Sequence, residues 1–333
     1  MKQRRGIRVK AMRDKDTQLT RRGVLLAGTG AFGLAALASQ ATTAFAHNSE
    51  QSAISGMQGT DQEWKAVASV FNVEGTIVPG GVLLIELPRI DLHPTVFGVA
   101  VKPAIGFVTQ IAFQHIAEQT IVKYQMVLLD SEVNPVLTAL FAQNLQPRTT
   151  NFNALQNHFL ELQPQVKFLH GTTIGDAVTI AKALRTALSQ SKQPFQSSSP
   201  GTTGLANQQI ASIIGGMEKI SDSVLSVAVA RNETICELGH VLKPTMQVSS
   251  MFNFQAIANG RAAVHGECIL LPSEVDAVAR TLRKHSFEVM AVHNHELFIR
   301  PLFYYLHSFS TGEPLTLAQY IRDALNQTNS RFV

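Results

Sequence analysis

Charged residues, cysteines and aromatic side chains are all scarce in this sequence. Of the 333 residues, 16% are charged and 7% are aromatic, and the only cysteines are Cys236 and Cys268. They form no CxxC pair, which argues against a zinc ribbon or a thioredoxin-like redox motif. Downstream of residue 46 the chain also has no GxGxxG and no GxxxxGK[ST] loop. A nucleotide-phosphate site of either type is therefore not predicted.

Positive charge is also lacking once the first 46 residues are set aside. The remaining chain has 19 of the 28 basic residues and 22 of the 24 acidic ones. Nucleic-acid binders carry a clustered basic face, and no basic run remains here. The sequence predicts no nucleic-acid partner.

The N-terminus has the three-part layout of a signal peptide. A basic stretch ends in Arg21-Arg22, an apolar segment rich in glycine and alanine follows, and Ala44-Phe45-Ala46 is a small-x-small cleavage site. The paired arginines are typical of twin-arginine export. The sequence thus predicts a signal peptide over 1–46, a disordered mature N-terminus over 47–61 and an extracytoplasmic location, periplasmic or secreted. The apolar segment is too short and too rich in glycine for a permanent membrane span.

The rest of the chain contains one unit twice. Matching segments keep the same order at offsets of 137 to 142 residues: Val82–Arg89 with Val224–Arg231, Lys102-Pro103 with Lys243-Pro244, Phe113-Gln114 with Phe254-Gln255, Leu129–Val133 with Leu271–Val275, Gln156–His158 with His293–His295, and His170 with His307. We predict a first repeat domain over 62–188 and a second over 205–330. The segment 189–204 is rich in Ser, Gln, Pro and Gly and reads as a flexible linker.

Each copy predicts an α+β fold, with a mainly antiparallel sheet and helices packed on one face. The expected order in the second copy is a helix over 208–217, strands over 224–229 and 262–271, a helix from Ser273, strands over 289–298 and 302–309, and a closing helix over 315–325. Ser273 and Asp276 have the spacing of a capping box. In an oxidising compartment Cys236 and Cys268 form either a disulfide or free thiols, and the spacing does not decide between them.

Histidines of the second copy form the strongest candidate site. His293 and His295 are two residues apart on a predicted strand and so point to one face. His307 lies on the next strand, and a register that pairs 293 with 307 would bring the three imidazoles together. Such a set suits a divalent transition metal ion: Zn, Cu, Fe or Ni. His265 is a further candidate ligand or an orienting residue, and Glu267 is a candidate general base.

Two other interpretations of this cluster remain open: a hydrogen-bonded structural cluster, and a metal-free acid/base or binding site. The first copy has Gln156, His158 and His170 at the matching positions and is predicted to hold a degenerate site. Arg89 and Arg231 end equivalent strands and are candidate anion-binding residues, with salt bridges as the alternative.

The two copies resemble the LppY/LpqO family of exported bacterial proteins, a duplicated domain of unknown function. The resemblance rests on Phe254-Gln255, Gly266-Glu267-x-Ile269-Leu270, Ser273-Glu274-Val275, Val292-His293-Asn294-His295 and Tyr305-Leu306-His307, and it extends through about 260 residues of both copies. It implies no agreed reaction. The sequence departs from the family pattern at Glu267, where Asp is usual, at the Pro301 turn, which lacks a following Arg, and at Gln156, where His is usual.

Together these features predict an exported protein that binds a metal or another small-molecule ligand in the second copy. If the protein is an enzyme, metal-assisted hydrolysis is the simplest reaction, with His293, His295 and His307 as ligands and Glu267 as base. The alternative is a non-catalytic cell-envelope binding module, whose partner is an envelope component and whose histidines are structural.

Overall fold

A computed structural model describes residues 62–143, 145 and 152–333 of the chain. The predicted signal peptide and the predicted disordered N-terminus lie outside the described residues. Each repeat forms one antiparallel sheet. The first sheet has the order β1-β2-β5-β6-β9-β7. Its strands are β1 (Thr76–Val78), β2 (Val82–Pro88), β5 (Val108–Ile116), β6 (Gln119–Leu129), β7 (Ala154–Gln156) and β9 (Val166–Gly175).

The second sheet repeats this order as β10-β11-β14-β15-β18-β16, with β19 paired to β11. Its strands are β10 (Met217–Ser221), β11 (Val224–Arg231), β14 (Ser250–Ala256), β15 (Ala262–Leu270), β16 (Glu288–His293), β18 (Tyr304–Gly312) and β19 (Ser330–Arg331). The predicted α+β class and the duplication are both confirmed.

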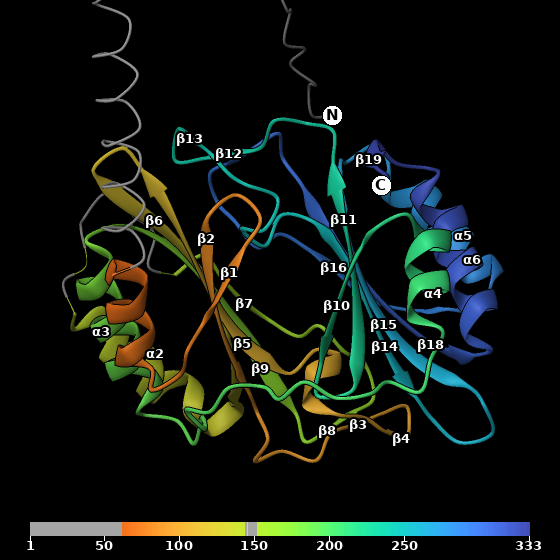
Figure 1. The fold of residues 1–333 in the computed structure, drawn as a ribbon, viewed down its shortest axis with the longest axis horizontal. Coiled ribbons are helices and arrows are strands. Elements are labelled where there is room, and N and C mark those ends of the chain that lie inside the picture. The colour runs from red at the N-terminus through yellow and green to blue at the C-terminus, as the bar shows by residue number, and fades with distance from the viewer. Residues whose placement is uncertain (1–61, 144, 146–151) are drawn as a thin grey trace, which may run out of the picture. The chain divides into compact units, whose positions relative to one another are not determined.

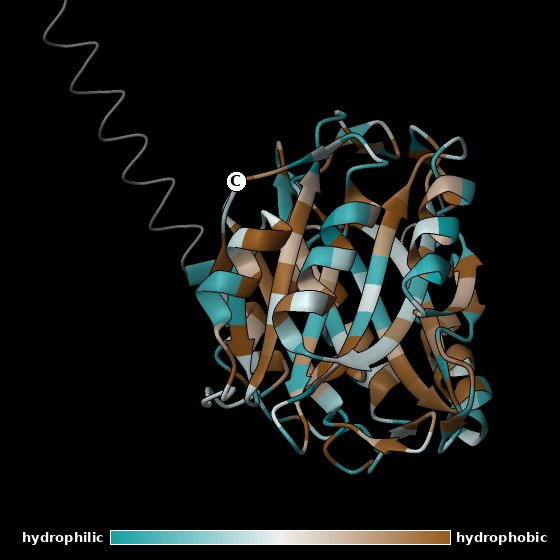
Figure 2. Ribbon diagram, turned by 90° about the vertical axis from the view of Figure 1, so that its right-hand side faces the viewer, coloured by the Kyte–Doolittle hydropathy of each residue, from teal (hydrophilic) through white to brown (hydrophobic). Residues whose placement is uncertain are grey.

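Helices cover the outer face of each sheet (Figure 1). In the first repeat these are the helical residues 62–70, α2 (Asp130–Phe141) and α3 (Ala177–Leu188). In the second they are α4 (Asn207–Ile214), α5 (Val275–Lys284) and α6 (Pro314–Leu325). Seen from the side of α4, α5 and α6, the helices carry both hydrophilic and hydrophobic residues, and the strands behind them include long hydrophobic stretches (Figure 2). Among the described helices, none is long and apolar enough to cross a membrane.

The inner faces of the two sheets pack against each other. On β15, Val264 and Cys268 point into the core beneath the helices, whereas Ala263 and Ile269 point into clusters shared with the first repeat. One shared cluster joins Phe168 to Phe309, and the other contains Ile121 and Tyr305. Because both faces of each sheet are buried, the strands are apolar on both sides. The sequence predicted that helices bury one face of each sheet. It did not predict that the other face is buried against the second sheet.

Two short three-stranded sheets and a 3₁₀ turn close the ends of this sheet pair. They are formed by β4 (Val99–Ala100), β3 (Thr95–Val96) and β8 (Leu162–Gln163), and by β13 (His240–Val241), β12 (Cys236–Glu237) and β17 (Ile299–Arg300). The 3₁₀ turn η1 (Pro103–Ile105) follows β4 and lies beside β14.

Reciprocal hydrogen bonds link the repeats at the matched Gln and Lys positions. Gln255 accepts from the Lys102 amide at 2.6 Å and donates to Ala100 O at 3.2 Å. Gln114 accepts from the Lys243 amide at 2.8 Å and donates to Val241 O at 2.8 Å. The pairs are equivalent in the two copies, so the interface has the self-complementary pattern of a two-fold dimer within one chain.

The segment between the repeats packs on the protein, in contrast to the flexible linker that its composition predicts. Gln193 is buried and bonds to Thr109 Oγ1 at 2.7 Å and to Leu87 O at 3.2 Å. The Ser199 backbone amide donates a hydrogen bond to Asp222 Oδ1 at 2.9 Å. Buried backbone polar groups need partners, and this segment supplies and receives them.

Arg89 and Arg231 do not form anion sites. Arg231 is buried and bonds to Glu233 and Glu274, each at 2.8 Å, and to Ile269 O at 3.2 Å. Arg89 makes the equivalent bonds to Asp91, Glu132 and Val127 O. Each guanidinium is already bound to two carboxylates of its own repeat, which corrects the anion-binding prediction in favour of a structural salt bridge.

The helix start in the second copy also differs from the predicted capping box. Helix α5 begins at Val275, and its cap residue Glu274 makes no capping bond to the first turn. Glu274 instead accepts from the Leu271 amide at 2.8 Å while pairing with Arg231. The strong buried partner decides the role of this carboxylate. Cys236 and Cys268 are both free thiols, and Cys268 lies in the core beneath the helices.

Candidate metal centre between the repeats

The end of β16 and the strand β18 carry the predicted histidines. The register pairs His293 with Tyr305 and Ala291 with His307, two residues away from the pairing considered from the sequence. His293 and His307 still share the inner face, because the shift is an even number of residues. The sequence predicted that His295 lies on the same strand as His293. The strand β16 ends at His293, however, and His295 lies in the loop that follows it.

Four histidines from both repeats meet at this face. His158, His293, His295 and His307 each offer a ring nitrogen, and these four atoms lie within 4.8 Å of one another. The His158 ring lies 4.0 Å from that of His307 and 4.9 Å from that of His293, measured between centroids. His158 was predicted to belong to a separate, degenerate site. The facing sheets bring it into the cluster of the second repeat.

Burial keeps these imidazoles neutral. His158, His295 and His307 are at most 5% exposed, and burial, together with the neighbouring histidines, holds their pKa values well below the usual range. Burial lowers the pKa of His293 to about 4, although this ring is the least enclosed of the four. Neutral imidazole is the form that binds metal ions.

Several ring nitrogens of the cluster are buried without a hydrogen-bond partner among the described residues. They are both nitrogens of His293, Nε2 of His295 and Nε2 of His307. Buried polar atoms are nearly always hydrogen-bonded, and each exception needs an explanation. Three adjacent rings with such nitrogens form a group that could hold a metal ion.

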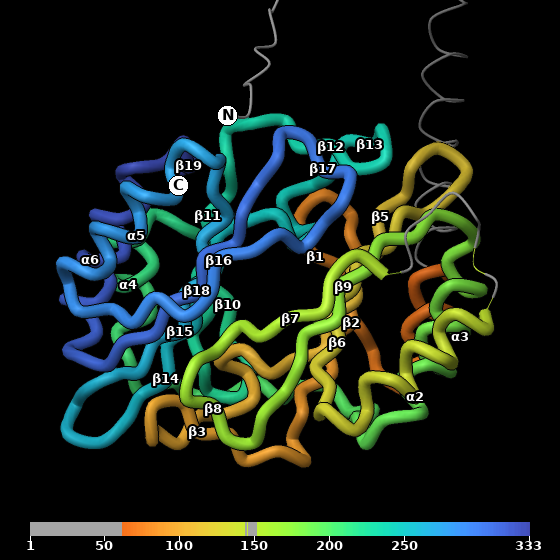
Figure 3. The backbone as a smooth tube through the Cα atoms, turned by 180° about the vertical axis from the view of Figure 1, so that it is seen from behind, coloured from red at the N-terminus to blue at the C-terminus, as the bar shows by residue number. Residues whose placement is uncertain are grey.

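The remaining first-copy residues lie around this cluster. His170 Nε2 is 3.2 Å from His158 Nε2, and the His170 ring stacks on His295 at 3.8 Å between centroids. Gln156 donates to the backbone oxygen of Asn294 at 3.1 Å. This bond joins the edge strand β7 to the loop after β16, and the two edges run near each other when the molecule is seen from behind (Figure 3).

Both predicted neighbours on β15 are next to His307. Glu267 is directly opposite His307 in the strand register, with Oε2 3.7 Å from His307 Nε2. Burial and the Glu296 carboxylate raise the pKa of Glu267 to about 8, although its side chain retains 21% of its exposure. His265 is buried, and its Nε2 lies 3.3 Å from His307 Nδ1.

A buried charged network beside the cluster was missed from the sequence. Lys123 bonds to Glu237 at 3.0 Å and also to Glu296, which accepts from the Tyr305 hydroxyl at 2.9 Å. Burial alone would lower the Lys123 pKa, but the two carboxylates raise it above its usual value. The available signals were a lysine within an apolar strand and a glutamate directly after His295.

The other Glu296 oxygen, Oε2, is buried without a partner among the described residues. Burial raises the Glu296 pKa, and Lys123 opposes this shift. The Tyr305 ring stacks on His295 at 3.6 Å between centroids. The network therefore contacts His295 through the Tyr305 ring, whose hydroxyl donates to the Glu296 carboxylate.

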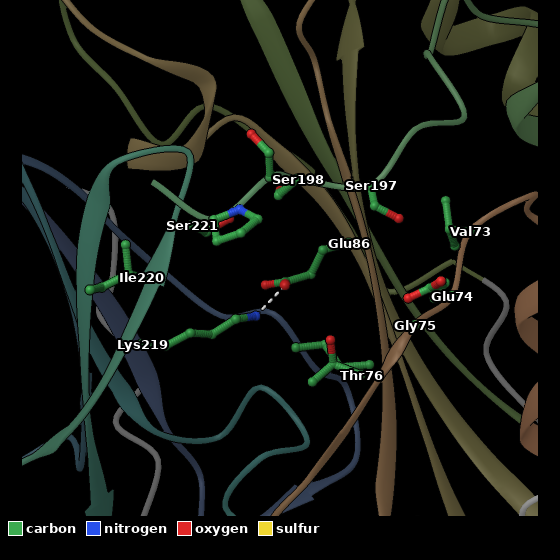
Figure 4. Close-up of a pocket in the computed structure, with 13 residues that line it drawn as sticks. Val73, Glu74, Gly75, Thr76, Glu86, Ser197, Ser198, Lys219, Ile220 and Ser221 are labelled. Atoms are coloured by element: carbon green, nitrogen blue, oxygen red, sulfur yellow. Dashed lines mark hydrogen bonds and ion pairs between the residues drawn. The ribbon is translucent and has the colours of Figure 1, made fainter. Parts of the chain in front are cut away.

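A separate cavity of about 230 Å³ lies between β1–β2 and β10. Its walls include the Glu86–Lys219 ion pair and serines of the connecting segment (Figure 4). None of its lining residues belongs to the histidine cluster.

A pair of facing α+β repeats with a shared histidine cluster defines the class of this protein. The chain matches a protein family described as a Domain of Unknown Function (DUF1259), over residues 65–190 and 208–327. These ranges cover most of the chain, which therefore belongs to this family. No curated protein and no solved structure matches the chain.

Proposed function

We propose that the protein binds one divalent transition metal ion between its repeats, with His158, His293, His295 and His307 as ligands. The observation that carries this proposal is the convergence of four neutral imidazoles, three of which have buried nitrogens with no partner among the described residues. Imidazole sites suit Zn, Cu, Fe and Ni. In a purely structural cluster those nitrogens would be paired with one another or with protein donors.

The repeats contribute unequally to this site. The first supplies His158 and the second supplies the other three ligands. Gln156 stands where the second repeat has His293, and its amide bonds to backbone instead. The duplication would thus yield one complete site.

We further propose that the site performs metal-assisted hydrolysis of a small-molecule substrate. Glu267 lies opposite His307, with Oε2 3.7 Å from His307 Nε2, and a carboxylate in this position can act as a general base. Glu267 would accept the proton of the attacking water, and a metal ion held by the four histidines would supply the activation of that water. Access to the cluster would be on the side of His293, which is the least buried ligand.

The proposed location is extracytoplasmic. The twin-arginine signal that the sequence predicts over residues 1–46 supports this, as does the resemblance to the LppY/LpqO family. Twin-arginine export carries folded proteins, which suits a site that is assembled from both repeats before export.

The test of metal binding is elemental analysis of protein exported by its native host. We expect near-stoichiometric metal in the wild type and in His285→Ala, a control in which a histidine outside the cluster is removed. The double variant His293→Ala/His295→Ala should fold, as judged by circular dichroism, and contain no metal. If the wild type contains no metal and the double variant folds as well as the wild type, the result would favour the non-catalytic cell-envelope binding module instead.

Hydrolysis has its own test in Glu267→Gln, which keeps the size of the side chain and removes the base. We expect this variant to retain its metal and lose activity on a panel of ester, amide and phosphoester substrates by about 10²- to 10⁴-fold. Equal activity in the wild type and in Glu267→Gln would rule out Glu267 as the base, while leaving metal binding intact.

A further inference from the structure

We propose that His265 is a positioning residue that fixes the tautomer of His307, so that His307 presents the lone pair of Nε2 to the cluster. Ile105 of the first repeat sets this arrangement through its backbone oxygen. The role in metal binding rests on the function proposed above, whereas the tautomer itself does not.

The chain of hydrogen bonds begins at a carbonyl. Ile105 O lies 3.0 Å from His265 Nδ1 and also accepts from Asn253 Nδ2 at 3.0 Å. A carbonyl oxygen only accepts hydrogen bonds, so His265 Nδ1 carries a proton and donates it. His265 is buried and has no carboxylate partner among the described residues, so burial disfavours a second proton on its ring. The other nitrogen, Nε2, is therefore an acceptor.

The second step transfers this constraint to His307. His265 Nε2 lies 3.3 Å from His307 Nδ1. Because Nε2 accepts, His307 Nδ1 must donate, and a neutral His307 then has no proton on its own Nε2. That nitrogen is buried, has no partner among the described residues and belongs to the cluster. Orientation of a ligating histidine through its other ring nitrogen is the usual outer-shell device of metal sites.

Glycine at position 106 allows the carbonyl to come this close. A Cβ built on Gly106 would lie 2.8 Å from His265 Nδ1 and 2.9 Å from Cζ of Phe159. Both rings are buried between the sheets and have little room to move. Any larger residue at position 106 would push the His265 ring away from Ile105 O.

The first repeat has no such relay. At an offset of 142 residues Lys123 stands in place of His265, and it pairs with Glu237 and Glu296. The turn η1 and its carbonyl thus act on the second repeat only.

Nitrogen-15 NMR of histidine-labelled, metal-free protein tests the tautomer directly, because the two ring nitrogens have different shifts and couplings in each form. We expect the Nδ1–H tautomer for both His265 and His307 in the wild type. His265→Gln should preserve it, since an amide can donate to Ile105 O and accept from His307. His265→Leu should release it. An Nε2–H tautomer of His307 in the wild type would overturn the proposal.

Calorimetric titration with Zn²⁺ then tests the effect on binding. His265→Leu and Gly106→Ala should weaken Zn²⁺ binding about 10- to 100-fold, and His265→Gln should restore most of it. Full affinity in His265→Leu, combined with loss of binding in His293→Ala/His295→Ala, would refute the positioning role alone. Absence of Zn²⁺ binding by the wild type, together with metal-free protein from the native host, would refute the proposed function. The NMR experiment would still decide the tautomer independently.

Discussion

At the scale of single residues, burial divides the described histidines into two groups. His93 is exposed on the surface, whereas the rings between the sheets are enclosed and neutral. The physical cause is the cost of removing a charged imidazolium from water. The same cost makes these side chains suited to metal binding and unfavourable for folding in acid.

Acid should destabilise the metal-free protein through these buried histidines. The pKa of His265 is lowered to about 4 in the folded state, from 6.5 in the unfolded chain. The unfolded chain therefore takes up the proton first as the pH falls, and stability is lost between pH 6.5 and pH 4. The loss from this residue is about 3 kcal/mol.

Urea denaturation at pH 7 and pH 4 measures this loss. The difference in unfolding free energy between the two pH values should be about 3 kcal/mol smaller in His265→Gln than in the wild type. The difference between the proteins is the informative quantity, because Glu267 and Glu296 titrate with the opposite sign. An identical pH dependence in the two proteins would contradict the neutral, buried state of His265.

At the scale of helices and strands, one device is used in both repeats. An arginine at the end of β2 or β11 binds a glutamate in the first turn of α2 or at the start of α5, and that glutamate also accepts a backbone amide. The device fixes the helix to the sheet at the same place in each copy. It explains why Arg89 and Arg231 recur with Glu132 and Glu274 at a constant offset of 142 residues.

Removal of this arginine should be costly. Arg231→Met leaves Glu274 buried without its main partner, and we expect a loss of about 3 to 5 kcal/mol in unfolding free energy. Arg280→Met breaks an exposed pair with Asp276 and should leave the unfolding free energy almost unchanged. Thermal and chemical unfolding of the two variants provide the comparison. Equal stability of both would show that the Arg231–Glu274 pair does not fix α5.

The sequence predicts those helices and strands that are determined by residues close to them along the chain. Apolar periodicity and the internal repeat predict the helices and most long strands, because they depend on neighbours along the chain. The short strands β12 and β17 are held by pairing with each other, at a separation that no local pattern reveals. The same holds for His295, whose loop position follows from the end of β16 at His293.

At the scale of the whole molecule, the face-to-face packing of the repeats creates the site. The reciprocal Gln114 and Gln255 bonds and the shared clusters bring β7 and β16 together, and with them His158 and the second repeat's histidines. Sequence reasoning assigned His158 to a separate site because the interface between the repeats leaves no local signal. The choice of His293, His295 and His307 rested on strand alternation, which acts within one sheet.

The proposed ligands come from both repeats, and this provides the most direct test of the metal site. Calorimetric titration of the metal-free mature protein with Zn²⁺ should be compared in the wild type, in His158→Ala and in His93→Ala, an exposed first-repeat control. We predict unchanged affinity in His93→Ala. In His158→Ala the loss should exceed the roughly 10- to 100-fold that removal of an outer-shell partner costs. Wild-type affinity in His158→Ala would contradict a metal site that is built from both repeats.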